Sequence, residues 1–329
     1  MLALVTGASG FVGSHLVEAL LAAGWRVRRL ARPASPPAAA AGRAFTVVPL
    51  DDAAAIARSG ALADVDVVFH VAGVTRAHTA ARFAAGNVAP TRALLDAIAE
   101  TRGGRPPRGV LVSSQAAAGP ADGLGRPRTE DDAPAPAGSY GASKRAAEAA
   151  VATHPAGAAW ATVRPSAVFG ARDRDFLPVF RHAGRGLAAY PGTRGAALSL
   201  VHAPDLARAL VLAGTAAGSA GRSYFVAGWE EVPWPALYEA AARAAGRRIR
   251  LSVDLPGWAL AAAGAAGDLW SAAAGRDTLV GREKLALGRP RRWTCSAARA
   301  RRELGWAPAA GLGEAVAATR DWYRTAGWL

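Results

Sequence analysis

The N-terminal part of the sequence combines an apolar run, a glycine-rich turn and a helical pattern. Residues 3–6 are apolar, Gly7, Gly10 and Gly13 follow with two residues between successive glycines, and residues 14–24 have an amphipathic helical pattern. In a strand–turn–helix unit, such glycines make the tight turn and let the backbone approach a pyrophosphate, while the helix N-terminus points free N–H groups at the phosphates. The stretch therefore predicts a dinucleotide-binding unit.

Strand-like and helix-like segments alternate over the first half of the chain. The expected strands are residues 26–30, 45–50, 66–71, 109–113 and 158–163, and long helices are expected over 80–102 and 141–152. This alternation predicts a parallel sheet with helices on both faces. After Pro165 the pattern loosens, and the expected elements are strands at 197–201 and 223–227 and helices at 175–186, 204–216, 235–246, 258–274 and 311–326.

We therefore expect an α/β fold, a Rossmann-type doubly wound parallel sheet with a smaller, mainly helical C-terminal lobe that binds the substrate. Residues 1–165 would form the dinucleotide-binding domain, and residues 199–228 would return to it. Residues 166–198 and 229–329 would form the substrate lobe. The loop 120–136, rich in Pro, Gly and Asp, would cover the site.

Arginines, and no acidic residue, lie around the end of the second expected strand. NAD-binding proteins usually place an Asp or Glu there for the ribose 2′-hydroxyl, whereas a 2′-phosphate needs an Arg. Arg29 and Arg32 favour NADP(H), with NAD(H) as the alternative; a solvent-exposed arginine without this role is the competing interpretation. Asp51 would lie near the adenine or begin the next helix, and Ala72 and Gly73 would leave room for the cofactor.

Tyr140 and Lys144 lie four residues apart at the start of a helical run, and therefore on one helix face. A nearby ammonium group lowers the pKa of a phenol, which suits the pair to moving a proton on or off a hydroxyl or carbonyl group. Ser114 follows the fifth expected strand, at the sheet edge where parallel α/β folds place their chemistry. For the Tyr–Lys pair alone, a solvated surface pair is the alternative.

Composition excludes several classes of protein. The 329 residues carry a net charge of +14, nearly all from Arg, but there is no basic stripe with interleaved aromatics, so no nucleic-acid partner is expected. The single cysteine, Cys295, excludes a disulfide framework and a cysteine-based metal site, and fits a cytoplasmic location. We expect no metal, no signal peptide and no membrane span; residues 255–275 are too weakly hydrophobic to cross a bilayer, with docking on a membrane surface as a minor option.

Six segments resemble the extended short-chain dehydrogenase/reductase superfamily, and within it the NAD(P)-dependent epimerase/dehydratase family. They are Thr6–Gly13, His70–Gly73, Asn87–Thr91, Val112–Ser114, Tyr140–Lys144 and Arg164–Gly170. Their order and spacing match together, and the tail from Trp293 to Trp306 is also similar, so the resemblance covers nearly the whole chain. The dihydroflavonol-reductase and 3β-hydroxysteroid-dehydrogenase branches are the most similar.

The resemblance implies that Tyr140 is the general acid/base, that Lys144 tunes its pKa and binds the nicotinamide ribose, and that Ser114 bonds the reacting oxygen. It also implies that Arg32 binds the 2′-phosphate of NADP(H). Pattern and resemblance together give these expected cofactor-binding residues: Gly7, Gly10, Phe11, Val12, Gly13, Arg32, Asp51, Ala72, Gly73, Tyr140, Lys144 and Pro165.

Departures from the family pattern reduce the number of reactions that the site is expected to catalyse. Gln115 and Ala116 follow Ser114 where the sugar-nucleotide dehydratases carry Asp-Glu, and the residues after Arg164 lack the Asn found in many epimerases. We expect an NAD(P)H-dependent oxidoreductase that transfers hydride to or from a ketone, aldehyde or secondary alcohol.

Two alternatives stay open: a sugar-nucleotide epimerase, with a diphosphate held by Arg172, Arg174 and Arg181, and a non-catalytic dinucleotide-binding regulatory protein. By resemblance, a homodimer would form through the helices at 80–102 and 141–152.

Overall fold

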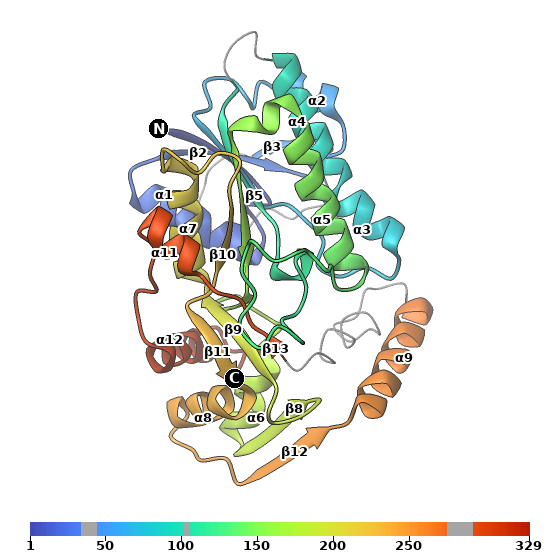
Figure 1. Cartoon of the computed structure of the whole chain (residues 1–329), viewed down its shortest axis with the longest axis vertical. Helices are drawn as coiled ribbons and strands as arrows, with labels where there is room; N and C mark the ends of the chain where they lie inside the picture. Colours follow the sequence, from blue (N-terminus) through green and yellow to red (C-terminus); the bar gives the residue numbers. More distant parts are fainter. Residues whose placement is uncertain (34–44, 102–105, 275–291) are drawn as a thin grey trace.

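A seven-stranded parallel sheet is the centre of the computed structural model, which describes residues 1–33, 45–101, 106–274 and 292–329 (Figure 1). In spatial order its strands are β10 (Ser223–Val226), β6 (Trp160–Pro165), β5 (Arg108–Val112), β4 (Val67–His70), β1 (Leu2–Thr6), β2 (Arg26–Ala31) and β3 (Phe45–Val47). All residues of β1, β4 and β6 are buried, as expected for strands covered on both faces. The predicted doubly wound parallel sheet is confirmed.

Helices cover both faces of this sheet (Figure 1). One face carries α1 (Phe11–Ala22), α7 (Ala203–Thr215) and α11 (Ala298–Leu304), and the other carries α2 (Ala53–Arg58), α3 (Ala80–Asn87), α4 (Ala89–Thr101) and α5 (Gly138–Thr153). Each face has its own apolar core: Leu16 and Leu206 belong to the first, and Ile56, Leu94 and Trp160 to the second. Two short 3₁₀ helices, η1 (Gln115–Ala117) and η2 (Pro155–Ala159), join strands to α5.

The single helix predicted over residues 80–102 is wrong. The structure has α3 and α4 instead, interrupted at Val88, and residue 102 lies outside the described residues. Pro90 explains the interruption, because proline lacks an N–H donor and its ring clashes with the carbonyl group four residues earlier.

The second lobe contains helices and two small sheets. Its helices are α6 (Leu177–Gly184), α8 (Trp234–Ala244), α9 (Gly257–Ala274) and α12 (Leu312–Thr325). One sheet joins β11 (Trp229–Pro233), β9 (Ala197–His202), β13 (Arg292–Trp293) and β7 (Ala167–Phe169), and the other joins β12 (Leu251–Leu255) to β8 (Leu187–Pro191). An aromatic core that includes Phe180, Tyr190, Tyr238 and Tyr323 stabilises the lobe. None of the described helices is long and apolar enough to span a membrane.

The region predicted to return to the first domain is divided between the two lobes. The helix α7 packs against α1, and β10 pairs with β6 of the large sheet. The strand β9, which begins before residue 199, pairs with strands of the second lobe. The domain boundary at residue 165 stays a prediction.

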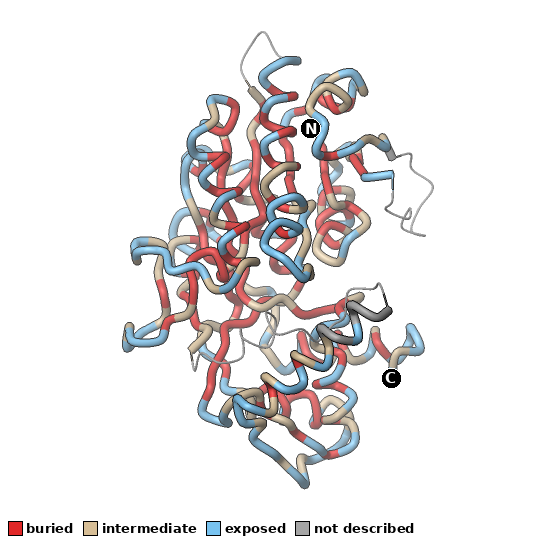
Figure 2. Tube along the Cα trace, turned by 90° about the vertical axis from the view of Figure 1, so that its right-hand side faces the viewer, coloured by how far each residue is buried: buried red, intermediate tan, exposed pale blue. Residues whose placement is uncertain are grey.

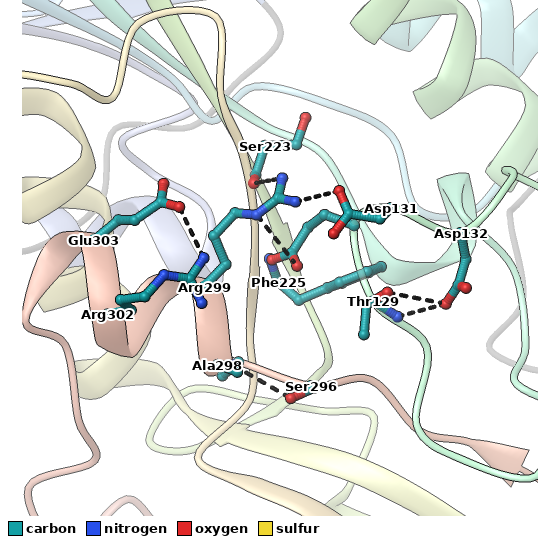
Figure 3. Close-up of polar contacts among 12 residues, drawn as sticks. Thr129, Asp131, Asp132, Ser223, Phe225, Ser296, Ala298, Arg299, Arg302 and Glu303 are labelled. Carbon is teal, nitrogen blue, oxygen red and sulfur yellow. Dashed lines mark hydrogen bonds and ion pairs between the residues drawn. The ribbon is translucent and has the colours of Figure 1, made fainter.

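The loop 120–136 is bound to the C-terminal segment (Figure 3), and none of its residues lines the cavity described below. Arg299 of α11 donates to the Asp131 carboxylate and lies 3.8 Å from that of Glu130. The Glu130 carboxylate also accepts a hydrogen bond from the Phe225 N–H at 2.7 Å, which ties the loop to β10. Arg128 extends the attachment with a β-bridge to Cys295. These bonds fix the loop against the sheet edge formed by β10.

Replacing Arg299 by Met should lower the free energy of unfolding by about 2 kcal/mol, because the buried Glu130 carboxylate loses its neighbouring cation. Arg302→Met is the matched control, since the Arg302 side chain is 66% exposed and pairs with the adjacent Glu303; a change below about 0.5 kcal/mol is expected. Urea unfolding curves of both variants test this, and equal losses would contradict it.

Candidate active site

A cavity of about 1240 Å³ lies at the carboxyl ends of the parallel strands. That volume exceeds the roughly 300–1,000 Å³ typical of small-ligand pockets. Segments that follow β1, β2, β4, β5 and β6 all contribute to its walls, and every residue predicted to bind the cofactor lines it. The cavity therefore brings together residues that are far apart in the sequence, as an α/β sheet does at its topological switch point.

The glycine turn between β1 and α1 forms one wall of the cavity. Gly7 has φ +69°, and a Cβ there would lie 2.6 Å from the backbone nitrogen of Ala72. A Cβ at Gly13 would lie 2.0 Å from the Gly7 carbonyl oxygen, so this helix–strand approach also requires glycine. Gly10, at the N-cap of α1, provides no side-chain cap for the helix N–H groups. The turn fits a pyrophosphate, whose charge suits a helix N-terminus.

Arg32 and Asp51 lie farther along the same wall, and both side chains are exposed. Arg32 follows β2, as predicted, at a position that suits a 2′-phosphate. Asp51 lines the cavity, and the next residue, Asp52, is the one that begins α2: its carboxylate accepts a 2.9 Å hydrogen bond from the N–H of Ala55. The residues present therefore fit a dinucleotide along this wall.

Ser114, Tyr140 and Lys144 also line this cavity. Ser114 follows β5 and caps η1, and it forms a hydrogen bond with the Tyr140 hydroxyl. Lys144, one turn after Tyr140 on α5, donates from Nζ to the Val112 carbonyl oxygen at 2.7 Å. The three side chains, predicted from two separate segments, thus converge on one cavity.

The pKa of Tyr140 moves in the direction opposite to the one predicted. Burial raises this pKa, the hydrogen bond to Ser114 opposes the rise, and the negative charge of Asp175 adds to it. Burial also lowers the pKa of Lys144 to about 8, against the attraction of Glu148. Desolvation therefore outweighs the ammonium charge, and the phenol is the stable form of Tyr140 at neutral pH.

Glu148 is a site residue that the sequence analysis missed. It lies one turn beyond Lys144, its carboxylate accepts 2.8 and 2.7 Å hydrogen bonds from Arg164, and it accepts a 2.6 Å hydrogen bond from Ser113. The two serines therefore have different partners: Ser113 bonds Glu148, and Ser114 bonds Tyr140. Spacing was the available signal, because residues 140, 144 and 148 form a stripe on one helix face.

Asn87 is a second missed residue. Its amide nitrogen donates to Ser143 at 2.9 Å and to the Val74 carbonyl at 3.0 Å, while its amide oxygen accepts from the Val74 N–H at 2.8 Å. A Cβ at Gly73 would lie 2.7 Å from this oxygen and 3.2 Å from Lys144 Nζ. Asn87 therefore fixes the turn after β4 against the helix that carries Tyr140.

The arginines assigned to a diphosphate under the epimerase alternative have partners within the protein. Arg172 donates to both carboxylate oxygens of Glu18, Arg174 stacks over the Trp328 ring at 5.1 Å, and Arg181 donates to the Trp328 carbonyl. These contacts tie the segment after β7 to α1 and to the C-terminal end of the chain.

A Rossmann-type sheet with a glycine turn at the mouth of a large cavity defines a nucleotide-binding α/β protein. The chain belongs to the NAD dependent epimerase/dehydratase family, whose model matches residues 3–227. The predicted membership of this family is confirmed.

Individual proteins are also similar to this chain. Ceramide reductase of Caulobacter vibrioides (strain NA1000 / CB15N) is 31% identical over 336 residues, which cover 99% of this chain and 95% of that protein. A 4-hydroxy-2-methyl-3-oxo-4-farnesyl-3,4-dihydroquinoline-1-oxide ketoreductase of Stigmatella aurantiaca is 36% identical over 54% of this chain and 53% of its own. The crystal structure of gox2253 has a TM-score of 0.78 and 28% identity, and the match covers 100% of this chain and 99% of that one.

Lys144 should lose its proton near pH 8, which NMR can measure directly because Lys144 and Lys284 are the only lysines of the sequence. Selective ¹³C-lysine labelling gives two signals, and Lys284→Arg assigns them. Glu148→Gln should lower the Lys144 pKa further, since it removes the carboxylate that raises it. Glu18→Gln, a carboxylate paired with Arg172, is the control and should leave the titration unchanged. A wild-type midpoint near the ordinary ~10.4 would contradict the burial of this ammonium.

Proposed function

We propose that the protein is an NADP(H)-dependent reductase that converts a ketone or aldehyde group of a lipophilic molecule to an alcohol, with NAD(H) as the alternative cofactor. The observation that carries this proposal is the convergence of Ser114, Tyr140 and Lys144 on a cavity that the glycine turn also lines. Of the predicted substrate lobe, residues 166–168 and 172–175 line the cavity and would contact the substrate.

Each side chain of the site has a distinct task in this proposal. A bound nicotinamide cofactor supplies the hydride. Tyr140, kept as a neutral phenol by burial, donates its proton to the carbonyl oxygen, which favours the reductive direction. Ser114 donates a hydrogen bond to the same oxygen as negative charge develops on it. The Lys144 ammonium stabilises the phenolate that Tyr140 becomes.

Relatives and cavity lining together support a lipophilic substrate. The names of the two relatives specify ceramide and a farnesyl-bearing 3-oxo compound. Val74, Phe83 and Val168 line the cavity, and the Phe83 ring lies 5.8 Å from that of Tyr140. Of the arginines assigned to a sugar diphosphate, Arg172 and Arg174 line the cavity but have partners within the protein, and Arg181 does not line it, which weighs against the epimerase alternative.

Tyr140→Phe should lower kcat by roughly 10²- to 10⁴-fold, because the phenol proton is lost while the ring keeps its packing. Ser114→Ala should lower kcat by roughly 10²- to 10³-fold. Oxidation of NADPH, followed by absorbance with a panel of long-chain ketones and aldehydes, measures both. Ser59→Ala, at the C-terminal end of α2 and outside the cavity lining, is the control and should keep the wild-type kcat.

The same panel separates the rival functions. Interconversion of a sugar nucleotide without net NADPH consumption would establish the epimerase. Binding of NADPH without turnover of any carbonyl compound or sugar nucleotide would establish the regulatory protein. Full turnover by Tyr140→Phe would refute the acid/base role in either enzyme.

Arg32→Gln should raise the KM for NADPH about tenfold or more and leave the KM for NADH unchanged, since a charge-assisted bond to the 2′-phosphate is lost. Arg26→Gln, at the other end of β2, is the control. Initial rates with both cofactors give the ratio of kcat/KM values. An equal loss with NADH and NADPH would show that Arg32 does not read the 2′-phosphate.

A further inference from the structure

Exposed apolar side chains concentrate on one part of the second lobe. Eight large apolar residues are exposed in the described part of the chain, and five of them lie on β8, β12 and α9. They are Leu187 (39% exposed), Leu251 (65%), Val253 (51%), Trp258 (76%) and Trp270 (70%). Gathered exposure of this kind marks an interaction surface, whereas single exposed residues need no explanation.

The strand pair β8–β12 presents an apolar outer face. Leu187 and Leu251 are direct partners in the parallel ladder, and Val253 follows Leu251 on the same face because side chains alternate along a strand. Tyr190 points to the opposite face, where its ring packs against Tyr238 of α8. The outer face is therefore open, while the inner face belongs to the core of the lobe.

The helix α9, which follows β12 in the chain, exposes two tryptophans. In Figure 1 it lies at the edge of the molecule, and in Figure 2 most of its described residues are exposed or intermediate. Its 18 residues, GWALAAAGAAGDLWSAAA, include a single ionisable group. A helix that is apolar around its circumference is normally buried in a core or in lipid. Tryptophan is the side chain that favours the boundary between water and bilayer.

Arginines flank the apolar face on one side. Arg247, Arg248 and Arg250 are exposed, and the sequence from residue 240 to residue 253 contains no acidic residue. Exposed Arg185 joins them, because its neighbour Gly186 accepts backbone hydrogen bonds from Arg250 at 2.8 Å and Leu251 at 3.2 Å. Four positive side chains thus border the exposed leucines.

We propose that this docking face, formed by Leu187, Leu251, Val253, Trp258, Trp270 and the four flanking arginines, binds the surface of a membrane that contains anionic lipids. The apolar side chains enter the interface between headgroups and acyl chains, and the arginines contact lipid phosphates. A second copy of the chain fits less well, since a twofold contact through the same face would bring two arginine clusters together. The proposal goes beyond the proposed reaction, because none of these residues lines the cavity.

Vesicle co-sedimentation tests the docking face with the full chain and needs no cofactor or substrate. Phosphatidylcholine vesicles with and without phosphatidylglycerol should show strong binding only when the anionic lipid is present. Arg247→Gln/Arg248→Gln/Arg250→Gln should weaken that binding about 100-fold. Trp258→Ser/Trp270→Ser should weaken it at least about tenfold without changing the charge.

Control variants test whether vesicle binding depends on the docking face or on the general attraction between anionic lipids and a protein of net charge +14. Arg26→Gln/Arg58→Gln/Arg222→Gln removes the same charge from exposed positions elsewhere and should keep most of the binding. Val47→Ser/Leu329→Ser removes exposed apolar groups elsewhere and should bind like the wild type.

Three results would overturn the proposal. They are absence of binding to anionic vesicles, equal losses in the docking-face and control variants, and conversion of a dimer to a monomer by Trp258→Ser/Trp270→Ser with unchanged vesicle binding. Turnover of a water-soluble ketone by the same variants should equal that of the wild type, so a failure of the reductase proposal and a failure of docking give different results.

Discussion

The buried ion pair between Arg164 and Glu148 is the interaction on which the geometry of the cavity depends. Their side chains are 7% and 4% exposed, and together they join the end of β6 to the middle of α5. Ser113 adds the end of β5 to the same carboxylate. Removing one partner of such a pair leaves an uncompensated buried charge, which costs about 3–5 kcal/mol. The pair therefore fixes the height and rotation of α5 relative to the sheet edge. It thereby also fixes the positions of Tyr140 and Lys144.

The same carboxylate organises the electrostatics of the site. Glu148 lies beneath Lys144 and favours its charged form, while burial disfavours it, so the ammonium titrates within reach of neutral pH. Asp175, paired with Arg76 at 2.5 Å, acts on Tyr140 from another segment of the cavity wall and favours the neutral phenol. Burial thus shifts the pKa values of both residues most, and two carboxylates modify the result: Glu148 of α5 acts on Lys144, and Asp175 of the cavity wall acts on Tyr140.

Local patterns predicted the parts of the site that lie within single segments. The glycine turn and the Tyr140–Lys144 pair each lie within a few residues, and the alternation of strands and helices placed their ends at one edge. The contacts that the sequence did not reveal join distant segments: Arg76 and Asp175 are separated by 99 residues, and the loop 120–136 meets α11 from the far end of the chain. The sign of the Tyr140 pKa shift also depends on burial, which a sequence pattern does not measure. Most strands of the second lobe were missed because they are two to five residues long and have no clear alternation.

The path of the chain through the two lobes has a consequence for how the protein can be made and altered. After β6 the chain leaves the large sheet, forms β7, α6, β8 and β9, and only then returns with α7 and β10. The helix α11, residues 298–304, completes the cover over the α1 face. During synthesis on the ribosome, a nascent chain that has emerged as far as Pro165 has an unpaired sheet edge and a partly bare apolar face. Swapping the second lobe between homologues, whether by recombination in evolution or in the laboratory, consequently requires the transfer of three separate stretches of sequence, which α7–β10 and α11 divide. A single crossover after Pro165 would build the large sheet from strands of both parents.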